Sequence, residues 1–280
     1  MIISVASGKG GTGKTLVSSS IAKAYGVCQF FDYDVEAPNA DIFLKPDIKN
    51  IQDVTIKQPY FITNSKYTFE KCAEFCQYNA VAAVKEDVIF FEELCHGCGG
   101  CILVGPVQAV REKDVSVGVV KKGFTPPGIF FASGDLKPGS LRGVTIQNVL
   151  EKLIEKDNLA IIDCPPGNSC NMVTAVRGSD FCILVTEPTP YGVSDLKISV
   201  EILRNLGISF AVIVNKFGIG NDEIFDYCSS QSIKILEKIP HDIEIARSYS
   251  RGDTLLEFDS SWKARFNKVI DEIRKEVSAK

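Results

Sequence analysis

Four cysteines have a spacing that suits a metal centre. Cys95, Cys98 and Cys101 are each separated by two residues, and Cys76 precedes them at a distance in the chain. A C-x₂-C-x₂-C triplet with one remote cysteine is typical of iron–sulfur ligands, although Zn²⁺ also accepts four thiolates. The tight triplet favours an iron–sulfur cluster, and a zinc site remains the alternative.

The cysteine segment also contains a decayed internal repeat. FEKCAEFCQYNAV (69–81) matches CGGCILVGPVQAV (98–110), with Cys72 aligned on Cys101. The repeat resembles that of two-cluster bacterial ferredoxins, in which the fourth cysteine of each run ligates the other run's cluster. By that resemblance only one ligand set survives, and Cys72 is left over. The resemblance implies one [4Fe–4S] cluster on these residues: Cys76, Cys95, Cys98 and Cys101.

A second chemical motif stands at the start of the chain. The apolar run 1–7 leads into a G-x₄-G-K-[ST] motif, and a helical pattern follows through Lys23. Glycines let backbone N–H groups approach phosphate oxygens, Lys14 neutralises the β- and γ-phosphates, and Thr15 reaches Mg²⁺. The motif predicts an ATP site built from these residues: Gly8, Lys9, Gly10, Gly11, Thr12, Gly13, Lys14 and Thr15.

Lys9 is an additional lysine that the general motif does not require. KGGTGKT resembles the deviant Walker A motif of the MinD/ParA/Mrp ATPase family, which includes the nitrogenase iron protein. The resemblance continues in DYDVEAPN (32–39), which corresponds to the family's first switch, and in IIDCPPG (161–167), which corresponds to its second switch and Walker B motif. Residues 212–216 resemble the base-recognition strand that ends in Asn-Lys.

The resemblance implies a role for each matching residue. Lys9 would reach the ATP of the other subunit across the two-fold interface of a homodimer, and Asn215 would bond the adenine. Asp32 and Asp163 would join Thr15 in the Mg²⁺ shell. The catalytic residues implied are Lys9, Lys14 and Asp34, with Asp34 positioning the attacking water.

Asp32 and Asp34 are not expected to be equivalent. They alternate at the end of a strand and therefore face opposite sides. One of them is expected to be catalytic, and we favour Asp34. Asp32 has the alternative role of capping the following turn.

The remaining chain alternates strands with helices, and continuous apolar runs such as 181–186 suit a buried parallel sheet. We expect strands at 128–132, 159–163, 181–186, 209–215 and 233–239, and helices at 142–155, 194–206 and 261–277. Residues 187–192 are expected to be a loop, and 121–128 a turn-rich stretch. The expected fold is α/β, a P-loop NTPase with a mostly parallel sheet covered by helices on both faces, plus a small inserted ferredoxin-like α+β module.

The cysteine segment interrupts the ATPase after its first switch. The expected domains are 1–57 with 112–280 for the ATPase and 58–111 for the inserted iron–sulfur module. Both ends of the insertion join the ATPase core, so nucleotide-driven movement passing to the cluster is a hypothesis from topology. A ferredoxin-bearing branch of the MinD family looks like this but carries two clusters, whereas this chain has lost one.

Composition indicates the cellular compartment and the kinds of partner that this chain is expected to have. Ten cysteines in a chain that opens without a secretion signal indicate a reducing cytoplasm and metal binding more than disulfides. A net charge of −4 gives no basic surface for nucleic acid. No apolar run approaches the ~20 residues of a spanning helix, so no membrane association is expected.

Three functions fit these observations. The favoured one is a slow, partner-stimulated ATPase whose dimer switch drives assembly or transfer of iron–sulfur or other metal cofactors to a client metalloprotein. The second is ATP-gated electron transfer to a redox partner. The third is a MinD-like positioning ATPase with a structural metal site. Cys170, just past the second switch, is a weaker candidate ligand for a subunit-bridging metal, and packing as a small buried side chain is its alternative.

Overall fold

The computed structural model describes residues 1–64, 66–85 and 87–279. The chain forms two compact units. The first contains Met1–Ile51, Val120–Asp135 and Gln147–Lys280, and the second contains Gln52–Val119 and Leu136–Ile146. The helix α5 (Gly143–Glu151) runs through the boundary between the last two segments and contributes residues to both units.

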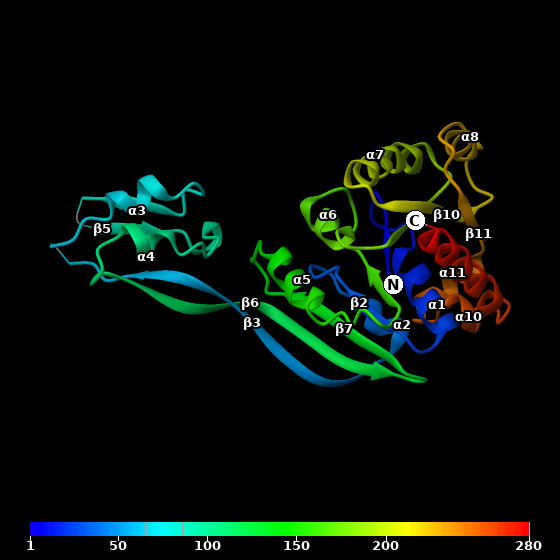
Figure 1. Cartoon of the computed structure of the whole chain (residues 1–280), viewed down its shortest axis with the longest axis horizontal. Helices are drawn as coiled ribbons and strands as arrows, with labels where there is room; N and C mark the ends of the chain where they lie inside the picture. Colours follow the sequence, from blue (N-terminus) through cyan, green and yellow to red (C-terminus); the bar gives the residue numbers. More distant parts are fainter. Residues whose placement is uncertain (65, 86, 280) are drawn as a thin grey trace. The chain divides into compact units, whose positions relative to one another are not determined.

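A nine-stranded sheet runs in the order β11-β10-β9-β1-β8-β2-β7-β6-β3. Six neighbouring pairs from β11 to β7 are parallel. Helices flank this sheet in the first unit (Figure 1). The α/β architecture with a mostly parallel sheet is confirmed. The strands of this part are β1 (Ile2–Ala6), β2 (Gln29–Asp32), β7 (Ile129–Leu136), β8 (Ala160–Asp163), β9 (Phe181–Thr186), β10 (Ser209–Phe217) and β11 (Ile235–Pro240).

The core lies between the sheet and the helices that cover it. Every residue of β9 is buried, as expected for a central parallel strand. Alternate residues of one face, such as Ile183 and Val185, pack in one apolar cluster with Val17 of α1 and Trp262 of α11. The helices of this unit are α1 (Lys14–Tyr25), α2 (Ala40–Leu44), α6 (Cys170–Val176), α7 (Pro190–Leu206), α8 (Glu223–Ser230), α9 (Ile243–Ser250), α10 (Leu255–Phe258) and α11 (Trp262–Ser278).

The loop expected at 187–192 is wrong for its second half. The helix α7 already begins at Pro190, because Thr189 caps it by accepting a hydrogen bond from the backbone N–H of Gly192 at 3.1 Å. A proline at the first helical position costs no hydrogen bond. Only Glu187–Thr189 therefore separates β9 from α7, which keeps this connection short and places it beside the phosphate loop.

Two long strands were not anticipated. β3 (Asp47–Phe61) and β6 (Val110–Thr125) run along the chain from one unit into the other. The turn-rich stretch expected at 121–128 is wrong as far as Thr125, because β6 continues to that residue. Most residues of β3 are exposed, so the strand lacks the apolar alternation by which a half-buried strand is recognised.

The second unit has a small core of its own. Its hairpin pairs β4 (Val81–Val84) with β5 (Asp87–Phe90) in antiparallel register, and three short helices accompany it: α3 (Glu70–Phe75), η1 (Glu92–Leu94) and α4 (Gly100–Val104). Positions that match in the internal repeat meet in this core, namely Val81 with Val110, and Cys72 with the partly buried Cys101. Residues from both copies of the repeat therefore share one small core.

Candidate functional site

The phosphate loop joins β1 to α1. Gly13 precedes the helix at φ +93°, a backbone conformation that favours glycine, and a Cβ atom there would come within 2.3 Å of the Asn215 amide nitrogen. Gly8 is packed as closely on the other side, where a Cβ atom would approach the Asp195 backbone oxygen of α7 to 2.6 Å. The loop's glycines therefore let two neighbouring elements close on it, while its N–H groups remain at the start of α1.

Thr15 and Asp163 lie together as a pair of oxygen-bearing side chains, the kind of groups expected at a Mg²⁺ site. The Thr15 hydroxyl donates to Asp163 Oδ2 at 2.7 Å, and Asp163 ends β8 beside β1. Asp163 Oδ1 is buried without a hydrogen-bond partner among the described residues. Burial raises the pKa of Asp163, although Lys14 and Thr15 oppose that change. An orphaned carboxylate oxygen next to a threonine hydroxyl suits a hard cation, whose ligands are oxygens.

Asp32 organises the first switch. This fully buried residue ends β2, and its Oδ1 accepts the backbone N–H of Asp34 at 3.0 Å. Its Oδ2 accepts the N–H groups of Asn39 and Ala40, both at 3.0 Å. Burial and then the negative charge of Asp163 raise the pKa of Asp32 well above its ordinary range. Asp32 therefore makes the capping contacts that were considered as its alternative role. It also lies close enough to Asp163 for the negative charge of that residue to raise its pKa.

Asp34 is the more accessible of the two switch carboxylates. It is half-buried, and burial raises its pKa to about 6, with Lys14 acting in the opposite direction and Asp163 in the same one. A carboxylate with a pKa near neutrality is suited to exchanging a proton with a reacting water. The positive charge of Lys14 acts on Asp34, so this carboxylate lies toward the phosphate end of the site.

Glu187 was not singled out from the sequence, yet it holds two lysines of the site. Lys9 Nζ pairs with Glu187 Oε1, and Lys216 Nζ lies 2.8 Å from Glu187 Oε2. Lys216 also donates to the Gly11 carbonyl at 3.1 Å. Burial alone would raise the pKa of Glu187, but the hydrogen bonds from Lys216 and Lys9 outweigh it and lower the pKa. The extra lysine of the loop is thus held within its own chain.

Asn215 supports the loop directly. Its side-chain nitrogen donates to the Thr12 carbonyl at 2.8 Å, and its Oδ1 accepts the backbone N–H of Lys216 at 2.8 Å. Asn215 also lines a cavity of about 220 Å³ together with Gly11, Gly13 and Leu16 of the loop and α1. The other side of this cavity is lined by Pro240, His241, Asp242, Ile245, Ala246 and Tyr249. A cavity that adjoins the phosphate loop and has a largely apolar wall suits a nucleoside base.

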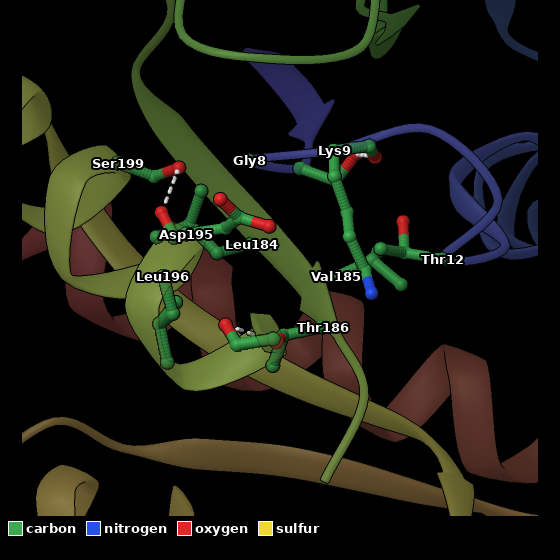
Figure 2. Close-up of a pocket in the computed structure, with 11 residues that line it drawn as sticks. Gly8, Lys9, Thr12, Leu184, Val185, Thr186, Asp195, Leu196 and Ser199 are labelled. Atoms are coloured by element: carbon green, nitrogen blue, oxygen red, sulfur yellow. Dashed lines mark hydrogen bonds between the residues drawn. The ribbon is translucent and has the colours of Figure 1, made fainter. Parts of the chain in front are cut away.

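A smaller pocket lies between the phosphate loop and α7. Figure 2 shows Gly8, Lys9 and Thr12 on one side of it. Thr186 at the end of β9 and three residues of α7 form the other side: Asp195, Leu196 and Ser199. The Ser199 hydroxyl donates to the Asp195 carbonyl at 3.1 Å, as Figure 2 shows, and to Asn168 Oδ1 at 2.7 Å. The hydrogen bond from Ser199 to Asn168 connects α7 to the segment that follows Gly167 of the second switch.

All four candidate cluster ligands line one small pocket of the second unit, with a volume of about 20 Å³. Cys95 is buried, Cys98 is exposed, and Cys76 and Cys101 are half-buried. Two sulfurs accept backbone hydrogen bonds, Cys76 from Ala80 at 3.3 Å and Cys95 from Gly97 at 3.4 Å. Hydrogen bonds to ligand sulfurs are a feature of iron–sulfur sites. The donor types therefore suit a cluster bound by four thiolates, although the four side chains, as they lie among the described residues, are not arranged as a ready metal site.

The thiols of this pocket influence one another electrostatically. Burial, and then the four neighbouring cysteine thiolates, raise the pKa of Cys101 to about 12. A metal ion bound by the sulfurs would offset the mutual repulsion of the thiolates, since metal ligation deprotonates a thiol. Within the described residues, no three His, Cys, Asp or Glu side chains are arranged so that they could hold a metal ion.

The remaining cysteines lie elsewhere. Cys72 is fully buried in the small core, and its thiol donates to the Cys101 carbonyl at 3.8 Å. Cys170 is exposed at the start of α6. The others are buried and pack as small apolar side chains: Cys28, Cys164, Cys182 and Cys228.

Arg142 is a second residue that was not singled out from the sequence. Its guanidinium donates to the Cys95 carbonyl from Nε at 3.0 Å and to the Glu92 carbonyl from Nη2 at 2.7 Å. Both acceptors are backbone groups far away in the chain, so no local sequence signal points to this contact. Arg142 therefore holds the turn from which the Cys95 side chain projects.

The fold and the phosphate site define a P-loop nucleotide-binding protein. Residues 3–255 match the model of the CobQ/CobB/MinD/ParA nucleotide binding domain, and the chain belongs to this family. Its fold is similar to that of the septum site-determining protein MinD complexed with Mg-ADP from Pyrococcus horikoshii, with a TM-score of 0.59 and 19% identity over 97% of this chain and 95% of that one. The cell division ATPase MinD of Pyrococcus furiosus is similar with a TM-score of 0.58 and 18% identity, covering 98% of each chain.

Sequence relatives extend the comparison. An uncharacterized protein of Methanocaldococcus jannaschii is 29% identical over 92% of this chain and 93% of its own length. An iron–sulfur cluster carrier protein of Aquifex aeolicus is 19% identical over 91% of this chain and 61% of its own length. Among the described residues, no helix is both long enough and apolar enough to cross a membrane.

Proposed function

We propose that this protein is a slow, partner-stimulated ATPase that works as a homodimer and handles iron–sulfur cofactors for a client protein. One [4Fe–4S] cluster would be bound by four thiolates: Cys76, Cys95, Cys98 and Cys101. The observation that carries the proposal is that thiols from separate stretches line a single pocket, in a chain whose other unit has a complete phosphate loop and carboxylate pair.

The residues of the first unit suit hydrolysis of ATP. Lys14 and the loop N–H groups would neutralise the phosphates, and Thr15 with Asp163 would hold Mg²⁺. When bound, Mg²⁺ supplies positive charge at the phosphate oxygens where negative charge develops. Asp34 would orient the water, and its pKa of about 6 leaves it mostly ionised at neutral pH.

Lys9 supports a switch that depends on dimer formation. In the single chain its ammonium group is held by Glu187. The triphosphate of a second subunit would compete with this carboxylate for the same ammonium group. Dimerisation would then require Lys9 to leave Glu187, which makes the resting ion pair part of the proposed switch.

Two observations favour cluster transfer over electron transfer alone. Cys98 is exposed, so one ligand is accessible to a client, whereas Cys95 is buried. The similarity to an iron–sulfur cluster carrier protein points in the same direction. A carrier should release its cluster to a client, whereas a reductase should retain it through repeated changes of oxidation state.

Substitutions of the two loop lysines test the ATPase part. Lys14→Ala should abolish ATP binding in a titration with a fluorescent nucleotide. Lys9→Ala should keep measurable binding but lose ATP-dependent dimerisation by light scattering, with turnover reduced by roughly a hundredfold or more. Lys156→Ala, an exposed lysine far along the chain, serves as the control. Dimers and normal turnover in Lys9→Ala would contradict the shared site.

A further inference from the structure

The cavity that suits a nucleoside base has one aromatic side chain in its wall. Tyr249, in the last turn of α9, lines this cavity of about 220 Å³ opposite Gly11 and Gly13 of the phosphate loop. Tyr249 keeps 38% of its surface exposed, so part of the ring is open to a ligand. Aromatic side chains stack on nucleobases whatever the base is. Tyr249 is therefore the residue of this wall that suits contact with a base.

The same tyrosine stacks on the helix that follows the first switch. The ring centroids of Tyr249 and Phe43 of α2 lie 4.9 Å apart at an interplanar angle of 28°, which is a favourable geometry for an aromatic pair. Phe43 is only 3% exposed and is not among the described residues that line the cavity. Tyr249 thus contacts the cavity and α2, whereas Phe43 contacts α9 without reaching the cavity.

A second close approach joins the end of α9 to α2. Gly252 follows α9 at φ +78°, and a Cβ atom there would come within 2.8 Å of Ile42 Cγ2 and 3.0 Å of the Ile42 carbonyl oxygen. Gly252 also donates its N–H to the Tyr249 carbonyl at 2.9 Å. The side-chain stack and the backbone approach are therefore neighbours on one tightly packed surface, and close packing transmits a displacement of one element to the next.

The start of α2 shares one anchor with the proposed catalytic carboxylate. Asp32 Oδ2 accepts the N–H groups of Asn39 and Ala40 at the start of α2, and Asp32 Oδ1 accepts the N–H of Asp34, each at 3.0 Å. Asp32 is fully buried, so packing leaves its side chain little room to follow one partner without the other. A shift of α2 therefore acts on Asp34 through the two oxygens of a single carboxylate.

We propose that Tyr249 and Phe43 are positioning residues that make the placement of Asp34 depend on a base in the cavity. A base stacked on Tyr249 would fix the aromatic pair and hold α2 against Asp32, which sets Asp34 for the attacking water. A polyphosphate without a base would fill the phosphate loop and leave the pair unsupported. The inference rests on the proposed function, because it assigns a base-dependent control to the proposed hydrolysis. It makes a nucleoside triphosphate, and not a polyphosphate alone, the effective substrate.

Hydrogen exchange on the full chain tests this link without relying on turnover. Saturating Mg-ATP should slow exchange of residues 8–15 and 32–41. Mg-tripolyphosphate should slow residues 8–15 to a similar extent, but its effect on residues 32–41 should be at least about fivefold smaller, the lower range of typical coupling between sites.

Substitutions in α9 separate the stacked ring from other causes. Tyr249→Leu removes the ring, and its response to Mg-ATP at residues 32–41 should fall to the level seen with Mg-tripolyphosphate. Tyr249→Phe keeps the stack and should respond as the wild type does. Ile243→Ala is the matched control, because Ile243 is an exposed apolar residue of the same helix that is absent from the described wall of the cavity.

Phe43→Leu tests the link from the other end and leaves the described cavity wall unchanged. It should lower kcat for ATP by about fivefold or more, with KM within about twofold of the wild type. A raised KM with unchanged kcat in Phe43→Leu, a wild-type response in Tyr249→Leu, or equal effects of the two ligands on residues 32–41 of the wild type would overturn the inference and leave the ATPase proposal intact. No response of residues 8–15 to Mg-ATP would overturn both proposals.

Discussion

Replacing Asp34 by asparagine should separate stability from activity. In the nucleotide-free protein Asp34 has a pKa of about 6, against the ordinary value of 3.8, mainly because it is partly buried. The folded state therefore resists ionisation of this carboxyl group more than the unfolded state does. Asparagine has a similar shape and never ionises, so Asp34→Asn should be the more stable protein at neutral pH.

The magnitude follows from the two pKa values. The difference between about 6 and 3.8 corresponds to roughly 3 kcal/mol in an unscreened site. Because Asp34 is partly exposed, solvent screening reduces this, and we expect about 1 kcal/mol of added stability. A group whose pKa is raised on folding destabilises the protein only where it is ionised. The advantage of asparagine should be absent below about pH 4, grow as the pH rises, and be complete above the folded pKa of about 6.

Urea unfolding of both proteins between pH 4 and pH 8, followed by circular dichroism, measures this difference. Asp41→Asn, at an exposed position of α2, is the control for the substitution itself. Steady-state ATP hydrolysis by Asp34→Asn should fall by roughly a hundredfold or more, because the carboxylate proposed to orient the water is gone. Equal unfolding free energies at pH 7.5, or hydrolysis at the wild-type rate, would refute the account of Asp34.

Two further substitutions test other parts of the site. Cys72→Ser should retain iron, because the Cys72 thiol lies in the small core, whereas Cys76→Ser should lose most of it; equal iron in the two variants would contradict the ligand assignment. Glu187→Gln should destabilise the nucleotide-free protein by about 1–2 kcal/mol at pH 7, because Lys9 and Lys216 lose their shared carboxylate. Since these lysines lower the pKa of Glu187, its contribution is present above its unfolded pKa and should fade as the pH falls through the folded pKa, and a loss independent of pH in thermal unfolding scans would argue against the ion pair.

Features encoded by local spacing could be predicted from the sequence. The phosphate loop, the buried strand β9 and the final helix depend on neighbouring residues, and the structure has β9 at the expected bounds and the helix within one residue of them. The apolar stripe of α11 is buried as its period predicts, including Trp262 and Phe266. The loop expected at 187–192 was wrong although a local signal was present, because the Thr189-Pro190 pair is typical of a helix start and α7 begins at Pro190.

Features that depend on distant contacts could not be predicted. Lys9 and Glu187 are 178 positions apart, and Arg142 meets Cys95 across 47 positions, so no local pattern connects either pair. The strands β3 and β6 escaped notice for a different reason. Their exposed residues do not alternate with a buried face, so the usual period of two is weak in them.

The most direct test of the proposed function is the metal content of anaerobically purified protein, together with its visible and EPR spectra before and after dithionite and Mg-ATP. About four irons per chain, a signal that appears on reduction, and a spectral change on adding Mg-ATP are the predicted results. One zinc per chain, no visible absorption and no EPR signal would contradict the account, and would make the cysteine pocket a structural zinc site.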